Sequence, residues 1–183
     1  MSQIPSISDA FRTVVAATEA AIIADTSLDW GTLAKKVYFM QGSLLEITNV
    51  LQSYTNSPSY KNKKYPLVIL VRDVKEKLNK QLNGLGTSFK CHLLIITLTN
   101  PELRSDQREA QNFKPVLLPI FEELINQISK SKLFAMPTVK DMDITKWDCY
   151  FYGTKENIKK NIFNDYVDAI DIESITLNTK NIC

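Results

Sequence analysis

Two strongly apolar segments of the chain leave few choices for its fold. Residues 65–71 read YPLVILV, with apolar side chains on consecutive rather than alternate positions. Such a strand is buried on both faces and belongs in the centre of a covered sheet. Pro66 is tolerated there, because an opening residue need not donate a ladder hydrogen bond. Residues 89–99, FKCHLLIITLT, form a second strand that is long enough to project beyond a core, and we expect it beside the first.

Helix caps predict two helices before these strands. The first covers about residues 7–24, with Ser6 or Ser8 as its cap. The second begins after Ser43 and Glu46, whose three-residue spacing is that of a capping box. Its apolar face is expected to consist of Ile47, Val50, Leu51 and Tyr54.

A third and longest helix is predicted at roughly residues 110–130. Its packed face keeps a 3.6-residue period through Phe113, Leu117, Ile120, Phe121, Leu124, Ile125 and Ile128. Pro115 and Pro119 interrupt this pattern, because proline cannot donate a helical hydrogen bond. We therefore expect the helix to start late, near Lys114, and to kink around residue 119.

Shorter segments supply the remaining strands. Residues 37–40 and the aromatic run 147–152 read as strands, and 170–177 as an alternating last strand. Residues 73–87 fit either a short helix or a long strand connection. The order of elements then matches the β-α-β-β-α-β pattern of split βαβ folds, with one helix added in front.

This pattern predicts an α+β protein with a mixed, mostly antiparallel sheet packed by helices. We expect one domain over residues 1–183: an N-terminal helix and connection at 1–34, a core at 36–152, and a C-terminal strand and tail at 153–183. No run of 18 apolar residues is present to span a bilayer, and the N-terminus lacks a secretory signal pattern. Synthesis in a cytoplasm without membrane association is the expectation.

The sequence carries no recognisable catalytic motif. The single histidine, His92, lies inside a predicted strand, and neither a triad nor a phosphate-binding glycine loop accompanies it. Cys91 points to the opposite face and reads as a small core residue. Cys149 and Cys183 form no CxxC pair with it, so neither a disulfide framework nor a thiolate metal site is expected. We predict that the protein is not an enzyme and needs no cofactor.

Six aspartates in the C-terminal part could be imagined as a carboxylate metal site. They are Asp141, Asp143, Asp148, Asp165, Asp168 and Asp171. Their spacing lacks the glycine and closing glutamate of a calcium-binding EF-hand loop. Solvated acidic loops are the preferred interpretation, and no metal is expected.

Charge is distributed unevenly along the chain. The net charge is −3 over residues 1–34, +7 over 35–90 and −2 over 91–183. The basic middle segment includes Lys61, Lys63, Lys64, Lys75, Lys77 and Lys80. Lysines at 75, 77 and 80 could contact DNA phosphates or a protein partner. Opposite patches also suit head-to-tail association of identical copies, which is how cyclic rings are built.

A short loop before the longest helix carries charges of alternating sign. Arg104, Asp106, Arg108 and Glu109 follow one another there. One interpretation is a solvated connection with Asp106 as a helix cap. The other is a contact between subunits, in which case Arg104→Glu with Arg108→Glu should weaken self-association without unfolding the protein.

Three blocks of the sequence carry a family resemblance. They are VYFMQGSLLEITNVL, SYKNKKYPLVILVRD and LLIITLTNPELRSDQREAQNFKPVLLPIFEEL, which together span roughly residues 36–130. The shared elements are a strand before a capped helix, the strand entry at Lys64 to Leu67, Asp73 closing that strand, and the RSDQR element at Arg104 to Arg108. Together they resemble the tail-terminator or tail-completion proteins of tailed bacteriophages, including neck rings of the crAss-like group.

The resemblance implies a structural virion protein. It implies a homo-oligomeric ring, hexameric or dodecameric, that joins the portal side to the tail while DNA passes through its lumen without sequence-specific contacts. Portal or adaptor proteins and tail proteins would be its neighbours, and its location would be the neck or tail of the virion. The helix in front and the strands after residue 145 depart from the family pattern. A nucleic-acid-associated protein that binds through the basic segment 61–80 is the alternative.

Overall fold

The computed structural model describes residues 6–31, 33–55, 57, 64–81, 84–131, 133–135, 144–150, 152 and 165–179. The side chains of residues 55, 72–81, 84–87, 135 and 179 lie outside this description. In the described residues a six-stranded sheet has the order β1-β2-β3-β6-β4, and β5 also pairs with β6. Its strands are β1 (Tyr38–Gly42), β2 (Leu67–Gln81), β3 (Gly84–Leu98), β4 (Phe134–Ala135), β5 (Thr145–Cys149) and β6 (Val167–Thr179).

The sheet is mixed, as predicted for an α+β protein. Only β1 and β2 are parallel, while β2, β3, β6 and β5 follow one another in antiparallel pairs. The predicted order of elements is present, but β1 and β2 are direct neighbours. The βαβ unit is therefore not split, which corrects that part of the prediction.

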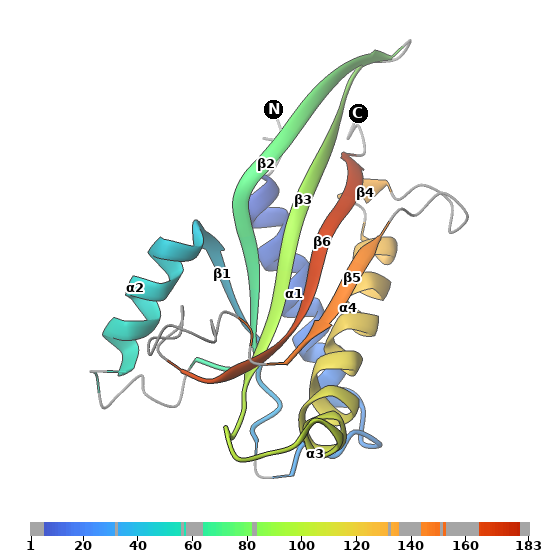
Figure 1. Ribbon diagram of the computed structural model, residues 1–183. Helices are drawn as coiled ribbons and strands as arrows, with labels where there is room; N and C mark the ends of the chain where they lie inside the picture. Colours follow the sequence, from blue (N-terminus) through green and yellow to red (C-terminus); the bar gives the residue numbers. More distant parts are fainter. Residues whose placement is uncertain are drawn as a thin grey trace.

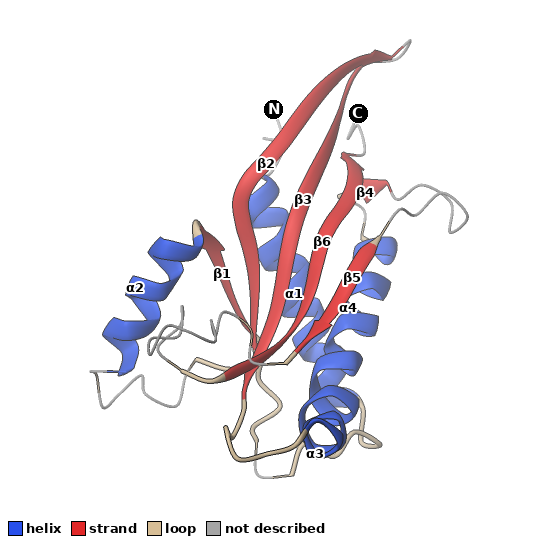
Figure 2. Ribbon diagram, in the orientation of Figure 1, coloured by secondary structure: helices blue, strands red, loops and turns tan. Residues whose placement is uncertain are grey.

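Helices cover the two faces of the sheet unequally (Figures 1 and 2). On one face, α1 (Ile7–Ala24) and α4 (Leu118–Lys130) pack on the larger core, which includes Val68, Leu93, Ile95 and Ile170. On the other face, α2 (Leu44–Thr55) packs on Leu67, Ile69, Leu94 and Ile96. Neighbouring positions of β2 and β3 thus serve opposite cores, which confirms that consecutive apolar residues indicate a strand buried on both faces.

Local capping explains where the first two helices begin. Ser6 precedes α1, and its hydroxyl accepts the backbone N–H of Asp9 at 3.2 Å. Ahead of α2, Glu46 accepts the backbone N–H of Ser43 at 2.8 Å, and the Ser43 hydroxyl accepts the Glu46 N–H at 3.3 Å. This reciprocal pair is the predicted capping box.

The longest helix starts earlier than predicted. α3 (Ser105–Arg108), the π-helix η1 (Glu109–Leu117) and α4 follow one another without a break. In the π-helical part the N–H of Leu118 donates to the carbonyl of Phe113, five residues back. This wider turn holds Pro115, and Pro119 sits in the first turn of α4, where its missing N–H is harmless. The late start near Lys114 is therefore wrong.

The sequence left the segment 73–87 open; its residues 73–81 belong to β2 and its residues 84–87 to β3. Each of these strands has 15 residues. Their register shifts between Val71 and Lys75, and the register of β3 with β6 shifts between Cys91 and Leu93. Bulges of this kind bend a sheet and increase its twist. Farther toward its tip, past the last pair of β3 with β6 at Ser88, the hairpin of β2 and β3 leaves the helical layers as a projecting arm (Figure 1).

Candidate subunit interface

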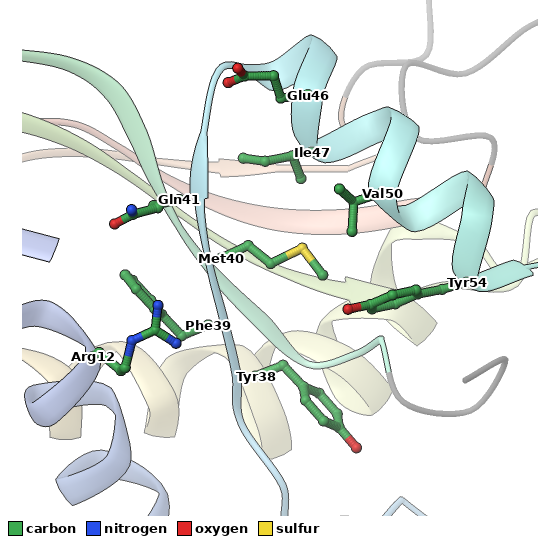
Figure 3. A pocket seen from close by; sticks show the side chains of 9 residues that line it. All are labelled: Arg12, Tyr38, Phe39, Met40, Gln41, Glu46, Ile47, Val50 and Tyr54. Carbon is green, nitrogen blue, oxygen red and sulfur yellow. The ribbon is translucent and has the colours of Figure 1, made fainter. Parts of the chain in front are cut away.

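A groove runs along the outer side of β1. It has a volume of about 380 Å³ and lies between α1 and α2 (Figure 3). Its lining comprises Arg12 from α1, then Tyr38, Phe39, Met40 and Gln41 from β1, and Glu46, Ile47, Val50 and Tyr54 from α2 and its first turn. Most of this lining is apolar or aromatic, and its two charged residues are Arg12 and Glu46.

The sequence immediately after β1 sets the position of α2 beside the groove. Gly42 has a φ of 149°. Residues with a side chain rarely adopt this backbone conformation, so the tight connection requires glycine. Ile47 and Leu51 are buried against the sheet, as predicted, but Val50 is exposed and faces the groove. The prediction of Val50 as a packed residue is therefore wrong.

The backbone of β1 offers hydrogen-bonding groups to the groove. Tyr38 donates its N–H to the carbonyl of Pro66 at 2.9 Å, so Tyr38 points its backbone toward β2. Alternate residues of a parallel strand point their N–H and C=O the other way. Phe39 and Gln41 therefore present both groups outward, and within the described residues no strand pairs with them. An open strand edge of this kind is a template for another strand.

Charge and aromatic contacts shape the α1 side of the groove. The guanidinium carbon of Arg12 lies 5.5 Å from the centre of the Phe39 ring, within the range of a cation–π contact. Arg12 and Gln41 are both exposed. The cation is thus held at the open edge of the sheet, where a carboxylate of a partner could reach it.

Arg108, which the sequence offered as an interface residue, is buried instead. It is 1% exposed, and its Nη1 lies 3.2 Å from Oδ1 of Asp168, which is 0% exposed. Its Nε donates to the carbonyl of Leu103 at 2.8 Å. Asn112 completes the cluster with a 2.7 Å hydrogen bond to Asp168 Oδ2. These contacts fix the loop after β3 against β6, so the Arg108 side chain is not on the surface of the subunit, as the predicted contact required.

For the other three residues of that loop, the predicted role in a contact between subunits stays a prediction. Arg104 and Asp106 are 78% and 73% exposed, and Glu109 pairs with Lys114 at 3.0 Å on the surface. The N–H of Arg104 donates to the side chain of Gln107 at 3.0 Å. The N-cap of α3 is Arg104 and Asp106 lies inside the helix, so the prediction of Asp106 as the cap is wrong.

The basic segment is only partly described. Lys61 and Lys63 lie outside the described residues, whereas the backbones of Lys75, Lys77 and Lys80 belong to β2 and their side chains are not described. Lys64 is buried, and its Nζ lies 3.1 Å from Asp165 Oδ2. The hydroxyl of Tyr65 donates to the same oxygen at 3.1 Å. Burial and the adjacent carboxylate raise the pKa of Tyr65. Lys64 is therefore a structural residue, not a phosphate ligand.

The residues considered for catalysis and metal binding also have internal partners. His92 Nε2 lies 2.7 Å from Asp171 Oδ1. Cys91 is in the core, as predicted, and burial raises the pKa of its thiol to about 12. Asp148 pairs with Lys146 at 2.6 Å. Asp165 and Asp168 likewise form ion pairs, with Lys64 and Arg108, so these carboxylates have protein partners and do not belong to freely solvated loops as predicted.

Asp141 and Asp143 lie outside the described residues. In the part of the chain that the structure describes, no three metal-ligating side chains gather into a site. Over the same residues, no helix combines the length and the hydropathy that crossing a bilayer requires.

Comparison with known protein families and with curated proteins finds no match to this chain. The open edge of β1 was not predicted from the sequence. Whether a strand lies at the edge or in the centre of a sheet depends on which strands pair with it, and its own residues do not contain that information. The only local signal in the sequence was the polar Gln41 near the end of an otherwise apolar strand.

Proposed function

We propose that the protein is a structural virion protein that forms a ring in the head-to-tail connection of a tailed bacteriophage. The ring, a hexamer or dodecamer, would join the portal side to the tail and let DNA pass through its lumen. The resemblance over residues 36–130 suggests this role, and the α+β class with a mixed sheet is compatible with it. Assembly rather than catalysis is the proposed activity.

The observation that carries the proposal is the projecting arm of β2 and β3. Within the described residues, β1 accompanies β2 only as far as Val71, and β6 accompanies β3 only from Ser88 onward. The last pairs of the hairpin, from Leu78 with Thr87 to Gln81 with Gly84, form a two-stranded ribbon. Such ribbons are marginal in water unless something packs on them. Neighbouring copies in a ring would provide that support.

The test is the mass of the purified protein in solution. Light scattering over a range of concentration and salt, followed by electron microscopy, is expected to reveal a closed ring of one copy number. Because charges of opposite sign contribute to such contacts, the ring should dissociate more readily at high salt. A protein that is monomeric under every condition would contradict self-assembly into a ring.

A second candidate function, nucleic-acid binding, has one observation in its favour. At the base of the arm, where β6 still pairs with β3, the Cα partner of Lys75 in the β2–β3 ladder is Lys90, which is exposed. Like charges directly opposite each other are unfavourable in a sheet unless something neutralises them. A phosphate backbone would do so. The same arm could therefore contact DNA in a lumen or hold a duplex outside any ring.

The salt dependence of binding distinguishes DNA contact through the lysines of the arm from non-specific attraction of DNA to other basic residues of the protein. We expect measurable duplex binding at about 50 mM salt that weakens steeply as salt rises. Replacing Lys75, Lys77 and Lys80 by alanine should reduce the slope of log K against log salt by roughly 0.9 per lost phosphate contact. Lys114→Ala, at a lysine that is 68% exposed on the helical side, is the matched control. Absence of binding at low salt would exclude this function.

A further inference from the structure

We propose that β1 of one copy pairs with β5 of a second copy, so that the sheet continues from protomer to protomer. This inference rests on the proposed ring and names its contact surface. In the described residues the outer sides of β1 and β5 are both unpaired, and Figure 1 places them at opposite margins of the sheet. A contact between two different margins of identical subunits is heterologous, the type that generates rings.

The two strands match in length and in direction. Each has five residues. Because β1 runs parallel to β2 and every later neighbour is antiparallel, β5 runs opposite to β1. A second copy placed alongside in the same orientation therefore brings β5 antiparallel to β1. Antiparallel pairing uses direct hydrogen bonds perpendicular to the strands, and the outward groups of Phe39 and Gln41 are available for them.

The faces of the two strands also match. Lys146 extends over the ring of Phe121 in α4, with its Nζ 5.4 Å from the ring centre, so Lys146 and Asp148 lie on the face of α1 and α4. Trp147 lies on the opposite face, which α2 covers. With the five residues fully overlapped, Met40 of one copy comes opposite Trp147 of the next.

Trp147 is the side chain that would fill the groove. It is 60% exposed, and its indole N–H donates to Glu173 Oε2 at 3.3 Å. Tryptophan is enriched among the anchor residues of protein interfaces. In the fully overlapped register the ring would lie against Tyr38, Met40 and Val50 on the α2 side of the groove. The groove lies at one margin of the sheet and the exposed indole at the other. A second copy accounts for both, because the indole of one copy would fill the groove of the next.

Charges on the other face are complementary. Asp148, which is 45% exposed, would come opposite Phe39 and within reach of Arg12 above that ring. Opposite charges across an interface favour one orientation over others. A peptide of an unrelated protein would account for the groove alone, but not for Trp147 and Asp148 at the far margin.

Disulfide cross-linking tests the pairing and its register. In the proposed register Gln41 faces Lys146, and cross-strand Cα distances of about 4.5–5.5 Å allow a disulfide. Gln41→Cys and Lys146→Cys are made in separate chains, with Cys149 and Cys183 changed to serine. Cys91 can remain, because burial raises the pKa of its thiol to about 12. Oxidation of the mixture should give a cross-linked dimer that neither variant gives alone.

Two control results would overturn the proposal. Thr145→Cys lies on the opposite face of β5 from Lys146, so its mixture with Gln41→Cys should cross-link at least about tenfold less. Equal cross-linking of the two mixtures would mean random collisions. Cross-linking of Gln41→Cys with itself would mean that two β1 edges pair symmetrically, and it would replace the head-to-tail arrangement.

A proline variant tests the backbone hydrogen bonds. The N–H of Gln41 points away from β2, so Gln41→Pro should leave the fold intact while blocking a partner strand. We expect self-association at least about tenfold weaker than in Gln41→Thr, which keeps the N–H and β propensity, with equal unfolding midpoints. Equal self-association of these two variants would overturn the proposal.

The proposed contact and the proposed ring fail in distinguishable ways. Rings that form without the Gln41–Lys146 cross-link would refute this contact and leave the ring standing. Cross-linked open chains without closed rings would support the contact and contradict the ring. A protein that neither cross-links nor assembles would refute both.

Discussion

Replacing Arg108 by alanine should lower the free energy of unfolding by about 3–5 kcal/mol, the usual cost of removing one partner from a buried ion pair. Asp168, which is fully buried, would keep its hydrogen bond from Asn112 but lose the cation 3.2 Å away. The carbonyl of Leu103 would also lose the Nε donor. Chemical denaturation followed by circular dichroism measures the change.

Arg104→Ala is the matched control for this experiment. Arg104 lies four residues earlier in the same loop and is 78% exposed, so its loss should change the unfolding free energy by less than about 0.5 kcal/mol. Similar effects for the two variants would contradict the role of Arg108 as an internal tie. The same reasoning changes the assembly test, because Arg108→Glu would destabilise the subunit itself. Arg104→Glu with Glu109→Lys probes the surface of the loop without that effect.

Phe134→Ala should lower the free energy of unfolding by about 3–5 kcal/mol, the range measured for large aromatic residues in cores. The Phe134 ring is 1% exposed and lies 5.3 Å from the Phe11 ring and 5.6 Å from the Phe89 ring. It therefore joins α1, β3 and the short strand β4 at one point. Removing it leaves a cavity that three separate elements would have to close.

Leu45→Ala provides the comparison for Phe134→Ala. Leu45 is a large apolar residue that is 71% exposed on α2, and its truncation should cost less than about 0.5 kcal/mol. Denaturant midpoints of the two variants at equal slope give both values. A loss below about 1 kcal/mol for Phe134→Ala would show that the three elements do not depend on this ring.

Local signals in the sequence predicted much of the fold. The cap at Ser6 and the pair of Ser43 and Glu46 are made by residues three positions apart, so their geometry is visible in the sequence. Runs of apolar residues likewise indicated the central strands. The start of the long helix at Ser105 was missed because a π-helical turn accommodates Pro115, which ordinary helical rules treat as a break.

The candidate site depends on contacts that no local pattern contains. Asp168, the partner of Arg108, is 60 positions away along the chain, so a charged loop and a buried ion pair look alike in the sequence. The openness of β1 and β5 follows from strand order, which brings β6 between β3 and β5. Trp147 was predicted within an aromatic strand. Its exposure was not predicted, because it depends on the order of the strands in the sheet.

The placement of β6 has a consequence for how fast the protein folds. β2 and β3 follow each other closely along the chain and can form a hairpin within microseconds. The central pairing of Ile95 with Ile170, in contrast, must wait until a distant part of the chain arrives. Closing such a long loop costs entropy before any contact repays it, so we expect this step to limit the rate. Until then the edge of β3, with its row of apolar side chains, stays open to any other chain nearby.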